Sequence, residues 1–319
     1  MLVNKKWRLI GLVIACFALA SAIALVGCSS GGASSDSASS DASASASASS
    51  DASASESAAS DASASASAEA SELPTVTPGV LTVATGNPAW PPYVMNDDPE
   101  SGEGFEAALT YAVAEKMGFA KDKVVWVRTG FDEAITPGDK DWDMNIQQYG
   151  ITEERKQAVD FSSPYFKPTQ AIVVDSAEGH DKFAKATTCA ELADAVIGAE
   201  AGSTSYTWGM EKINGNIQVF NSNADAAAAL NAHQIDGIIL DTPTAVYMAD
   251  PEMEELDSAV LIGQIPGSEA DPLAFLLPKD SKLTAAVSEA VDALEADGTL
   301  QQLTDTWMAD YTTDVPVLG

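Results

Sequence analysis

The sequence predicts an α/β protein with two lobes, and two observations lead to this prediction. Strand-like apolar runs alternate with segments of helical spacing along most of the chain, which is the pattern of an α/β fold. The part that follows a leader and a low-complexity tract runs from about residue 75 to residue 319. This is longer than one hydrophobic core usually supports. Internal sequence repeats are absent.

Residues 1–27 have the pattern of a lipoprotein signal peptide. A basic start precedes an apolar run from Leu9 to Val26, and Leu25-Val26-Gly27-Cys28 has the form of a lipobox. An uncleaved membrane anchor is the alternative, because the apolar run is just long enough to span a bilayer. The small Gly27 before Cys28, and the switch to Ser and Gly after it, favour lipidation. The sequence therefore predicts an extracytoplasmic protein that a lipid on Cys28 anchors to the cell membrane.

Residues 28–74 are predicted to form a disordered tether. After Cys28 they are almost wholly Ser, Ala, Gly, Asp and Glu. Such a segment cannot bury enough apolar surface to offset its ordering entropy. As a flexible coil it would average about 35–40 Å from end to end. That length suits a tether that lifts a folded domain off a membrane.

The charge of the chain excludes several classes of partner. The formal net charge is −31, which argues against nucleic acid and anionic lipid surfaces because both are negatively charged. It favours solubility and repulsion between copies, so we expect a monomer. An attraction for cationic solutes is a second interpretation of the same charge.

Signatures of catalysis and of cofactors are sparse. Cys16 leaves with the leader and Cys28 carries lipid, so Cys189 is the one thiol of the mature chain and cannot form an internal disulfide. No phosphate loop, metal cluster or dinucleotide signature is present. His180 and His233 lie far apart in polar segments and are expected to be exposed. We therefore expect no cofactor and no metal.

The individual elements follow from local patterns. Phe105, Leu109, Val113 and Met117 recur at helical spacing, and Gly118 ends that helix. Strands are expected at residues 80–84, 124–127, 143–147, 170–174, 196–199, 217–220 and 235–240. Helices are expected at residues 105–117, 131–135, 203–213 and 281–296, and from Ser222, Pro243 and Thr299 onward.

Capping residues support several of these boundaries. Thr188 is expected to cap a helix, and Ser222 opens another in the manner of a capping box. Pro243 suits the first position of its helix. Gly298 is expected as the C-cap of one helix, and Thr299-x-x-Gln302 as the capping box of the next.

Arg155 lies in the most informative stretch of the chain. Ile151-Thr152-Glu153-Glu154-Arg155 is followed by Val159-Asp160-Phe161-Ser162-Ser163-Pro164-Tyr165, which places the arginine in a short helical turn between two strands. A fixed arginine can hold a carboxylate through two parallel hydrogen bonds, a geometry that lysine lacks. A surface ion pair with Glu153 or Glu154 is the alternative.

Four motifs together resemble the extracellular solute-binding proteins that serve ABC importers of polar amino acids. The first is the stretch around Arg155 just described. The others are Gly104-Phe105-Glu106-Ala107-Ala108-Leu109, Gly202-Ser203-Thr204-Ser205 and Gln234-Ile235-Asp236-Gly237-Ile238-Ile239-Leu240-Asp241. They follow the family's order and spacing across roughly residues 80–311. Ala108 replaces an acid of the family pattern, and Gly150 replaces its Ser or Thr.

The resemblance implies a two-lobed periplasmic-binding-protein type II fold with a double-crossover hinge. Lobe 1 would comprise residues 75–170 and 271–319, and lobe 2 residues 171–270. The lobes would close on an amino acid and deliver it to ABC permease subunits in the membrane, without catalysis.

The resemblance also assigns roles to individual residues. Arg155 would bind the carboxylate of the ligand, assisted by Ser203 and Thr204 at a helix N-terminus, and Asp241 would bind its ammonium group. Trp90 and Phe131 would enclose the ligand side chain. Gln147, Gln148 and Gly150 would lie beside Arg155, with Asn87 and Glu200 as further contacts. Core packing is the alternative for the aromatic residues, and simple helix capping for Ser203 and Asp241.

Two other functions remain open at this point. Some relatives of the family are dehydratases that act on prephenate-like cyclic acids, and Glu200 is the candidate general acid for such a reaction. A ligand-sensing lobe that reports to a separate membrane protein is the other. As for ligand specificity, Asn87 argues against a strictly cationic amino acid, whereas Glu200 argues for one.

Overall fold

The computed structural model describes residues 73–319, except residues 214–215, 253–254 and 269–270. The predicted signal peptide (1–27), Cys28 and all of the tether before Leu73 lie outside the described residues. No helix in the described part of the chain is both long and apolar enough to cross a membrane.

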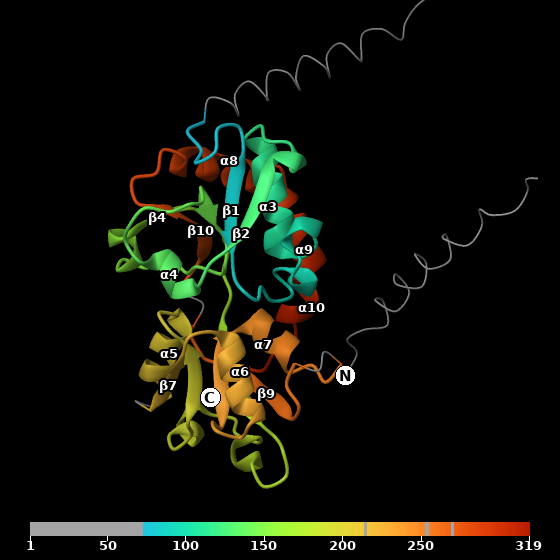
Figure 1. Ribbon diagram of the computed structural model, residues 1–319. Coiled ribbons are helices and arrows are strands. Elements are labelled where there is room, and N and C mark those ends of the chain that lie inside the picture. The colour runs from blue at the N-terminus through green and yellow to red at the C-terminus, as the bar shows by residue number, and fades with distance from the viewer. Residues whose placement is uncertain (1–72, 214–215, 253–254, 269–270) are drawn as a thin grey trace, which may run out of the picture. The chain divides into compact units, whose positions relative to one another are not determined.

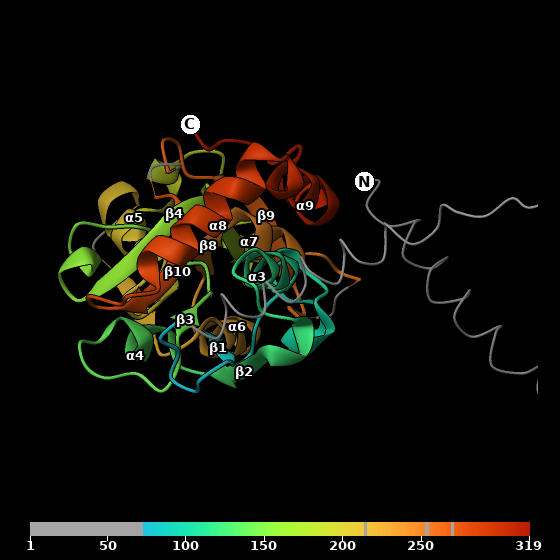
Figure 2. The same cartoon turned by 90° about the horizontal axis from the view of Figure 1, so that it is seen from above.

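The first lobe is built on a five-stranded mixed sheet with strand order β2-β1-β3-β10-β4. β1 pairs in parallel with β2 and β3, and β10 runs antiparallel to β3 and β4. Figure 2 shows α8 lying over β4 and β10. The strands are β1 (Leu81–Thr85), β2 (Val124–Arg128), β3 (Met144–Asn145), β4 (Val159–Phe166) and β10 (Leu273–Pro278). The helices are α3 (Phe105–Lys116), α4 (Phe131–Ile135), α8 (Thr284–Ala296) and α9 (Thr299–Trp307).

The second lobe repeats this topology with the strand order β7-β6-β8-β5-β9. β6 is parallel to β7 and β8, and β5 is antiparallel to β8 and β9. Figure 1 shows α5, α6 and α7 beside these strands. The strands are β5 (Gln170–Asp175), β6 (Ile197–Glu200), β7 (Ile217–Phe220), β8 (Gly237–Asp241) and β9 (Ala259–Gln264). The helices are α5 (Thr204–Lys212), α6 (Asn223–Asn231) and α7 (Thr242–Met248), with α10 (Ala309–Thr312) packed against α7.

Each sheet has its own hydrophobic core. Leu81, Phe105 and Phe275 belong to the first, and Ile172 and Ile197 to the second; all five are fully buried. Burying a side chain of this size contributes about 1.5–3 kcal/mol relative to its exposed state. The prediction of a two-lobed α/β fold is therefore confirmed.

The chain passes between the sheets at two places. It leaves β4 at Phe166 and enters β5 at Gln170, and it leaves β9 at Gln264 and enters β10 at Leu273. The hydroxyl of Thr169 donates to Oε1 of Gln264 over 2.7 Å, which joins the two crossings. The last residues return to the second lobe, where the Leu318 amide donates to the Gln264 carbonyl over 2.9 Å.

Several local expectations have definite outcomes. The predicted caps at Thr188 and Ser222 form, with Thr188 and Glu191 making a complete capping box. The capping box expected at Thr299 was wrong. Gly298, with φ of 83°, is the N-cap of α9, so Thr299 is already inside the helix.

Candidate functional site

A cavity of ≈ 170 Å³ lies between the two sheets. It forms where β1, β6 and β8 end, and the carboxyl ends of strands are where open α/β sheets bind ligands. Because β6 and β8 are parallel neighbours, Glu200 and Asp241 reach the same edge of the second sheet. The predicted residues that line the cavity are Asn87, Trp90, Phe131, Gln147, Gln148, Glu200, Ser203, Thr204 and Asp241. Arg155 and Gly150 are the two predicted residues outside this lining.

Arg155 joins the two lobes behind the cavity. Its side chain is buried, and Nη1 donates to the Gly150 carbonyl while Nη2 donates to the Gly202 carbonyl, both over 2.7 Å. Its Cζ lies 5.4 Å from the centre of the Phe131 ring. Burial lowers the pKa of Arg155. Within the described residues it forms no ion pair, and Glu153 pairs with Lys156 instead. The surface ion pair considered from the sequence was therefore wrong.

Gly150 lies close to side chains on both sides of the cavity. A Cβ at this position would lie 3.1 Å from Cβ of Asp271 and 3.4 Å from Cγ2 of Thr204. These separations are tighter than ordinary van der Waals contact, so a serine would displace its neighbours. Gly150 therefore serves this site through its backbone carbonyl.

Glu106 lies outside the cavity lining and holds the lining residue Gln148 in place. The carboxylate is fully buried, accepts a short hydrogen bond from the Tyr165 hydroxyl, and accepts from N and Nε2 of Gln148 over 2.9 and 2.5 Å. Burial raises the pKa of Glu106 to about 7, although these hydrogen bonds oppose the shift. Gln148 is thereby fixed, with φ of 52°. The position of Glu106 in the Gly104-Phe105-Glu106 motif was the sequence feature that could have indicated its role near the site.

Asp241 ends β8 and occupies the N-cap position of α7. The Tyr93 hydroxyl of the first lobe donates to its Oδ2 over 2.6 Å. Burial raises the pKa of Asp241, and the hydrogen bond from Tyr93 opposes that rise. The carboxylate thus contacts both lobes, which helix capping alone does not explain.

Glu200 ends β6 with little of its surface exposed. Burial, followed by the charges of Asp241 and Asp225, raises the pKa of Glu200 to about 8. Within the described residues no hydrogen bond reaches its carboxylate. The charged lining of the cavity consists of Glu200, Asp241 and Asp271, with no lysine or arginine among the described residues that line it. This wall is acidic, and an ionised Glu200 would need a cation to offset its charge.

The aromatic residues and the helix N-terminus enclose the rest of the cavity. Phe131 is stacked on Tyr149 with ring centres 4.6 Å apart, so it both packs in the core and lines the cavity. Oγ of Ser203 accepts from the Tyr206 amide over 3.1 Å and donates to the Glu200 carbonyl over 2.7 Å. That hydroxyl is therefore occupied as an N-cap, while the backbone start of α5 at Thr204 still faces the cavity.

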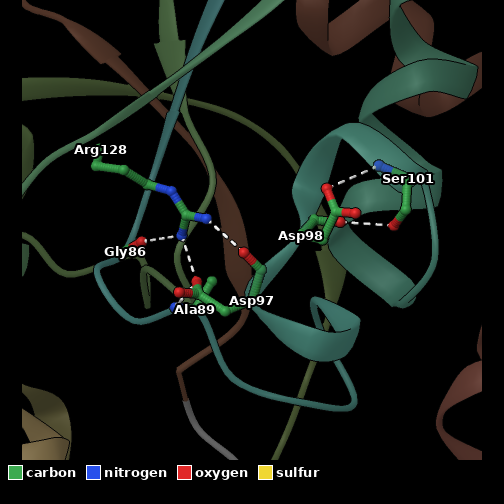
Figure 3. Close-up of polar contacts among 6 residues, drawn as sticks. All are labelled: Gly86, Ala89, Asp97, Asp98, Ser101 and Arg128. Atoms are coloured by element: carbon green, nitrogen blue, oxygen red, sulfur yellow. Dashed lines mark hydrogen bonds and ion pairs between the residues drawn. The ribbon is translucent and has the colours of Figure 1, made fainter.

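Arg128 holds the loop that carries Asn87 and Trp90 (Figure 3). Its Nη1 donates to the Gly86 carbonyl and to Oδ1 of Asp97, and its Nη2 to the Asp97 carbonyl, each over 2.6 Å. Oδ1 of Asp97 also accepts from the Ala89 amide over 2.8 Å. One guanidinium therefore fixes both ends of the loop. No local sequence pattern indicates this role.

Residues 81–310 match the model of the bacterial extracellular solute-binding proteins, family 3. The chain belongs to this family. Its relatives include the L-cystine-binding protein TcyJ of Escherichia coli strain K12, 27% identical over 70% of this chain and 81% of the relative. They also include the arginine-binding periplasmic protein of Mannheimia haemolytica, 27% identical over 73% of this chain and 93% of the relative.

Solved structures of related proteins have the same fold. An ancestral arginine-binding protein bound to arginine is similar with a TM-score of 0.59 and 27% identity, over 72% of this chain and 98% of that one. The ancestral amino-acid-binding protein AncCDT-1, a precursor of cyclohexadienyl dehydratase, is similar with a TM-score of 0.56 and 27% identity, over 72% and 94%. These family members are named for amino-acid binding, and the family is extracellular.

Proposed function

We propose that this protein is the substrate-binding component of an ABC importer and captures an amino acid in the cavity between its lobes, without catalysis. The cavity carries this proposal, because residues of both lobes line it and a buried arginine bridges them behind it. The amino-acid-binding relatives support it. The lobes would be residues 75–170 with 271–319, and residues 171–270, except that α10 and Leu318 pack against the second lobe. The two lobes would close around the ligand.

Arg155 would bind the ligand carboxylate. An arginine has five N–H donors, and the carbonyls of Gly150 and Gly202 take two of them. The Gly202 bond would be exchanged for the ligand when the lobes open and reclose. The start of α5 at Thr204 adds backbone N–H groups for the same carboxylate. Trp90, Phe131, Gln147, Gln148 and Asn87 would then surround the ligand.

Asp241 and Glu200 would bind positive charge on the ligand. Asp241 would take the α-ammonium group. Glu200 accepts no hydrogen bond within the described residues and has its pKa raised to about 8, so a second cation would relieve its buried charge. We therefore infer that the ligand carries a second positive group, as arginine, lysine and cystine do.

A binding screen tests this inference. Thermal unfolding of the purified protein should shift upward with arginine, lysine or cystine and much less with glutamine. A ligand at 100 times its Kd should add about 2.7 kcal/mol of stability. Equal shifts for glutamine and the cationic amino acids would overturn the role of Glu200. No shift for any amino acid would overturn the proposed function itself.

Attachment by lipid on Cys28 is part of the proposal. Cys28→Ala should release the protein into the medium or leave it as an unprocessed precursor in cell fractionation. Correctly processed protein in the membrane fraction would contradict it. Cross-linking to a candidate ABC permease, with and without ligand, would distinguish transport from sensing.

One observation favours an alternative function, the dehydratase. Glu200 is held protonated near neutral pH, which is the state that a general acid needs. Incubation with prephenate or arogenate tests this alternative. Turnover that Glu200→Gln abolishes would establish it, and no turnover would leave binding as the function.

A further inference from the structure

The two histidines of the chain meet on the surface of the second lobe. The sequence has His180 and His233 far apart, and the chain contains no other histidine. In the fold their rings stack with centres 4.1 Å apart and an angle of 13° between the planes. Both residues are exposed, as predicted. The fold thus brings together two residues that are far apart in the sequence.

The buried carboxylate of Asp175 contacts His233 and the turn before His180. It is the last residue of β5, and its side chain is 3% exposed. Oδ2 lies 2.6 Å from Nδ1 of His233, and Oδ1 accepts from the Ala177 amide over 2.8 Å. Because the His180 amide donates to the Ala177 carbonyl over 2.9 Å, one buried carboxylate fixes both the His233 ring and the turn that carries His180.

The backbone at His233 also favours this arrangement. α6 ends with the amides of His233 and Gln234 donating to the carbonyls of Leu230 and Ala229, each over 2.9 Å. This is a Schellman motif, whose left-handed residue is most often glycine. Here that residue is His233, with φ of 54°. A strained backbone therefore presents an imidazole where a glycine would fit without strain.

We propose that Asp175, His180 and His233 form a binding site for a divalent transition metal ion of the imidazole-binding class, such as Zn²⁺. One ligand atom from each residue lies within 4.8 Å of the other two. Imidazole nitrogen and carboxylate oxygen bind Zn²⁺ at about 2.0–2.2 Å, so tetrahedral ligands must come to about 3.4 Å of one another. The exposed histidine side chains can make this adjustment while the buried Asp175 stays fixed.

The site is separate from the cavity between the lobes. Gln170, at the other end of β5, lines that cavity, and five residues of strand separate it from Asp175 by about 16 Å. The ion would join the turn after β5 to the turn after α6, two segments of the second lobe. Three protein ligands would leave a fourth position for water or for an outside group.

Metal titration of untagged protein tests the proposal. Calorimetry with ZnCl₂ should give one ion per chain, and both imidazoles should shift together in a histidine side-chain NMR spectrum. His180→Ala and His233→Gly should each weaken binding at least tenfold, because even residues that only orient metal ligands cost 10- to 100-fold. Glycine suits the left-handed conformation at residue 233, so that variant should fold.

A control variant distinguishes Zn²⁺ binding at this site from general attraction of Zn²⁺ to the acidic surface. Glu178→Gln removes one negative charge from the same exposed turn without removing a proposed ligand, and it should change Zn²⁺ affinity less than twofold. Unchanged Zn²⁺ binding in the double histidine variant would overturn the proposal, and so would an equal loss in Glu178→Gln. Amino-acid affinity should be the same in all of these variants.

Discussion

The two lobes repeat one strand topology, but each buries a glutamate near the cavity in a different hydrogen-bonding environment. On the first lobe, the buried Glu106 accepts three hydrogen bonds from Tyr165 and Gln148. On the second lobe, Glu200 accepts none within the described residues. Burial raises the pKa of both carboxyls, to about 7 for Glu106 and about 8 for Glu200.

The difference indicates what each acid does. The hydrogen bonds of Glu106 come from residues of its own lobe, so its role is to hold Gln148 in place. Glu200 lacks such partners beside Asp241, so its buried charge needs a cation from outside the protein. Similar pKa shifts therefore accompany a structural role in one lobe and a binding role in the other.

The largest effect should come from breaking the proposed charge pair across the cavity. Arg155→Ala would leave the ligand carboxylate with backbone donors only. Loss of one partner from a buried charge pair costs about 2–5 kcal/mol, or roughly 30- to 5,000-fold in affinity. Asp241→Ala should cost a similar amount through the ammonium group. Calorimetry with the bound amino acid measures both.

Ligand chemistry distinguishes the two residues. The amide of the amino acid should bind wild type poorly, and Arg155→Ala should discriminate against it much less. Lys156→Ala is the matched control, because Lys156 is the neighbouring cation and pairs with the exposed Glu153. If Arg155→Ala binds the intact amino acid as tightly as wild type, the central assignment is wrong.

The next effect should be a pH dependence that originates on the second lobe alone. Glu200 must ionise to bind a cation, and its pKa in the empty protein is about 8. Affinity for a cationic amino acid should therefore rise with pH and be about tenfold weaker at pH 7 than at pH 9. Glu200→Gln should remove this dependence. A flat wild-type profile would show that Glu200 does not contact the cation.

The sequence was sufficient for the two-lobed α/β class but missed three strands. Strand β4 contains Pro164 and paired serines, a pattern that argues against a central strand. β4 and β9 lie at the sheet edges, where proline and weak patterns are tolerated. β10 was not predicted, although its apolar run lies inside the sheet between β3 and β4. The common strand order of the two sheets could not be predicted from the sequence, because the two lobes share no sequence repeat.

Much of the cavity lining was predictable because several of its residues lie at the ends of strands. Glu200 and Asp241 each follow an apolar run directly, so their place at the sheet edge could be inferred. The contacts of Glu106 with Tyr165, of Arg128 with Asp97 and of His180 with His233 could not. Each joins residues that are distant in the chain, and no local pattern encodes such pairings.

A smaller effect should come from Glu106, the buried acid of the first lobe. The raised pKa of Glu106 means that its stabilising contribution is present below its unfolded pKa, near 4.5, and is lost as pH rises through about 7. Glu106→Gln offers a donor and an acceptor as the protonated acid does, so its stability should be close to that of wild type at pH 5. It should exceed that of wild type at pH 8 by about 1–3 kcal/mol, because wild type must then hold a buried charge.

Urea unfolding of ligand-free protein at pH 5 and pH 8 measures this change. Glu115→Gln, on the exposed face of α3, is the matched control and should change little at either pH. A gap for Glu106→Gln that is constant with pH would mean that Glu106 does not titrate in this range, and the comparison between the two acids would fail.

The smallest effect should come from the loop of the first lobe that Arg128 holds. Lysine at this position keeps the charge but cannot reproduce the forked contacts to Gly86 and Asp97 (Figure 3). Arg128→Lys should therefore loosen the loop that carries Asn87 and Trp90 and weaken amino-acid binding by about three- to fivefold, or roughly 1 kcal/mol. Lys116→Ala is the control, because Lys116 forms an ion pair of 2.8 Å with Asp297 that has similar exposure but lies away from the loop. Equal affinities for Arg128→Lys and wild type would mean that the loop keeps its shape without the fork. The selectivity of the cavity would then depend on the second lobe alone.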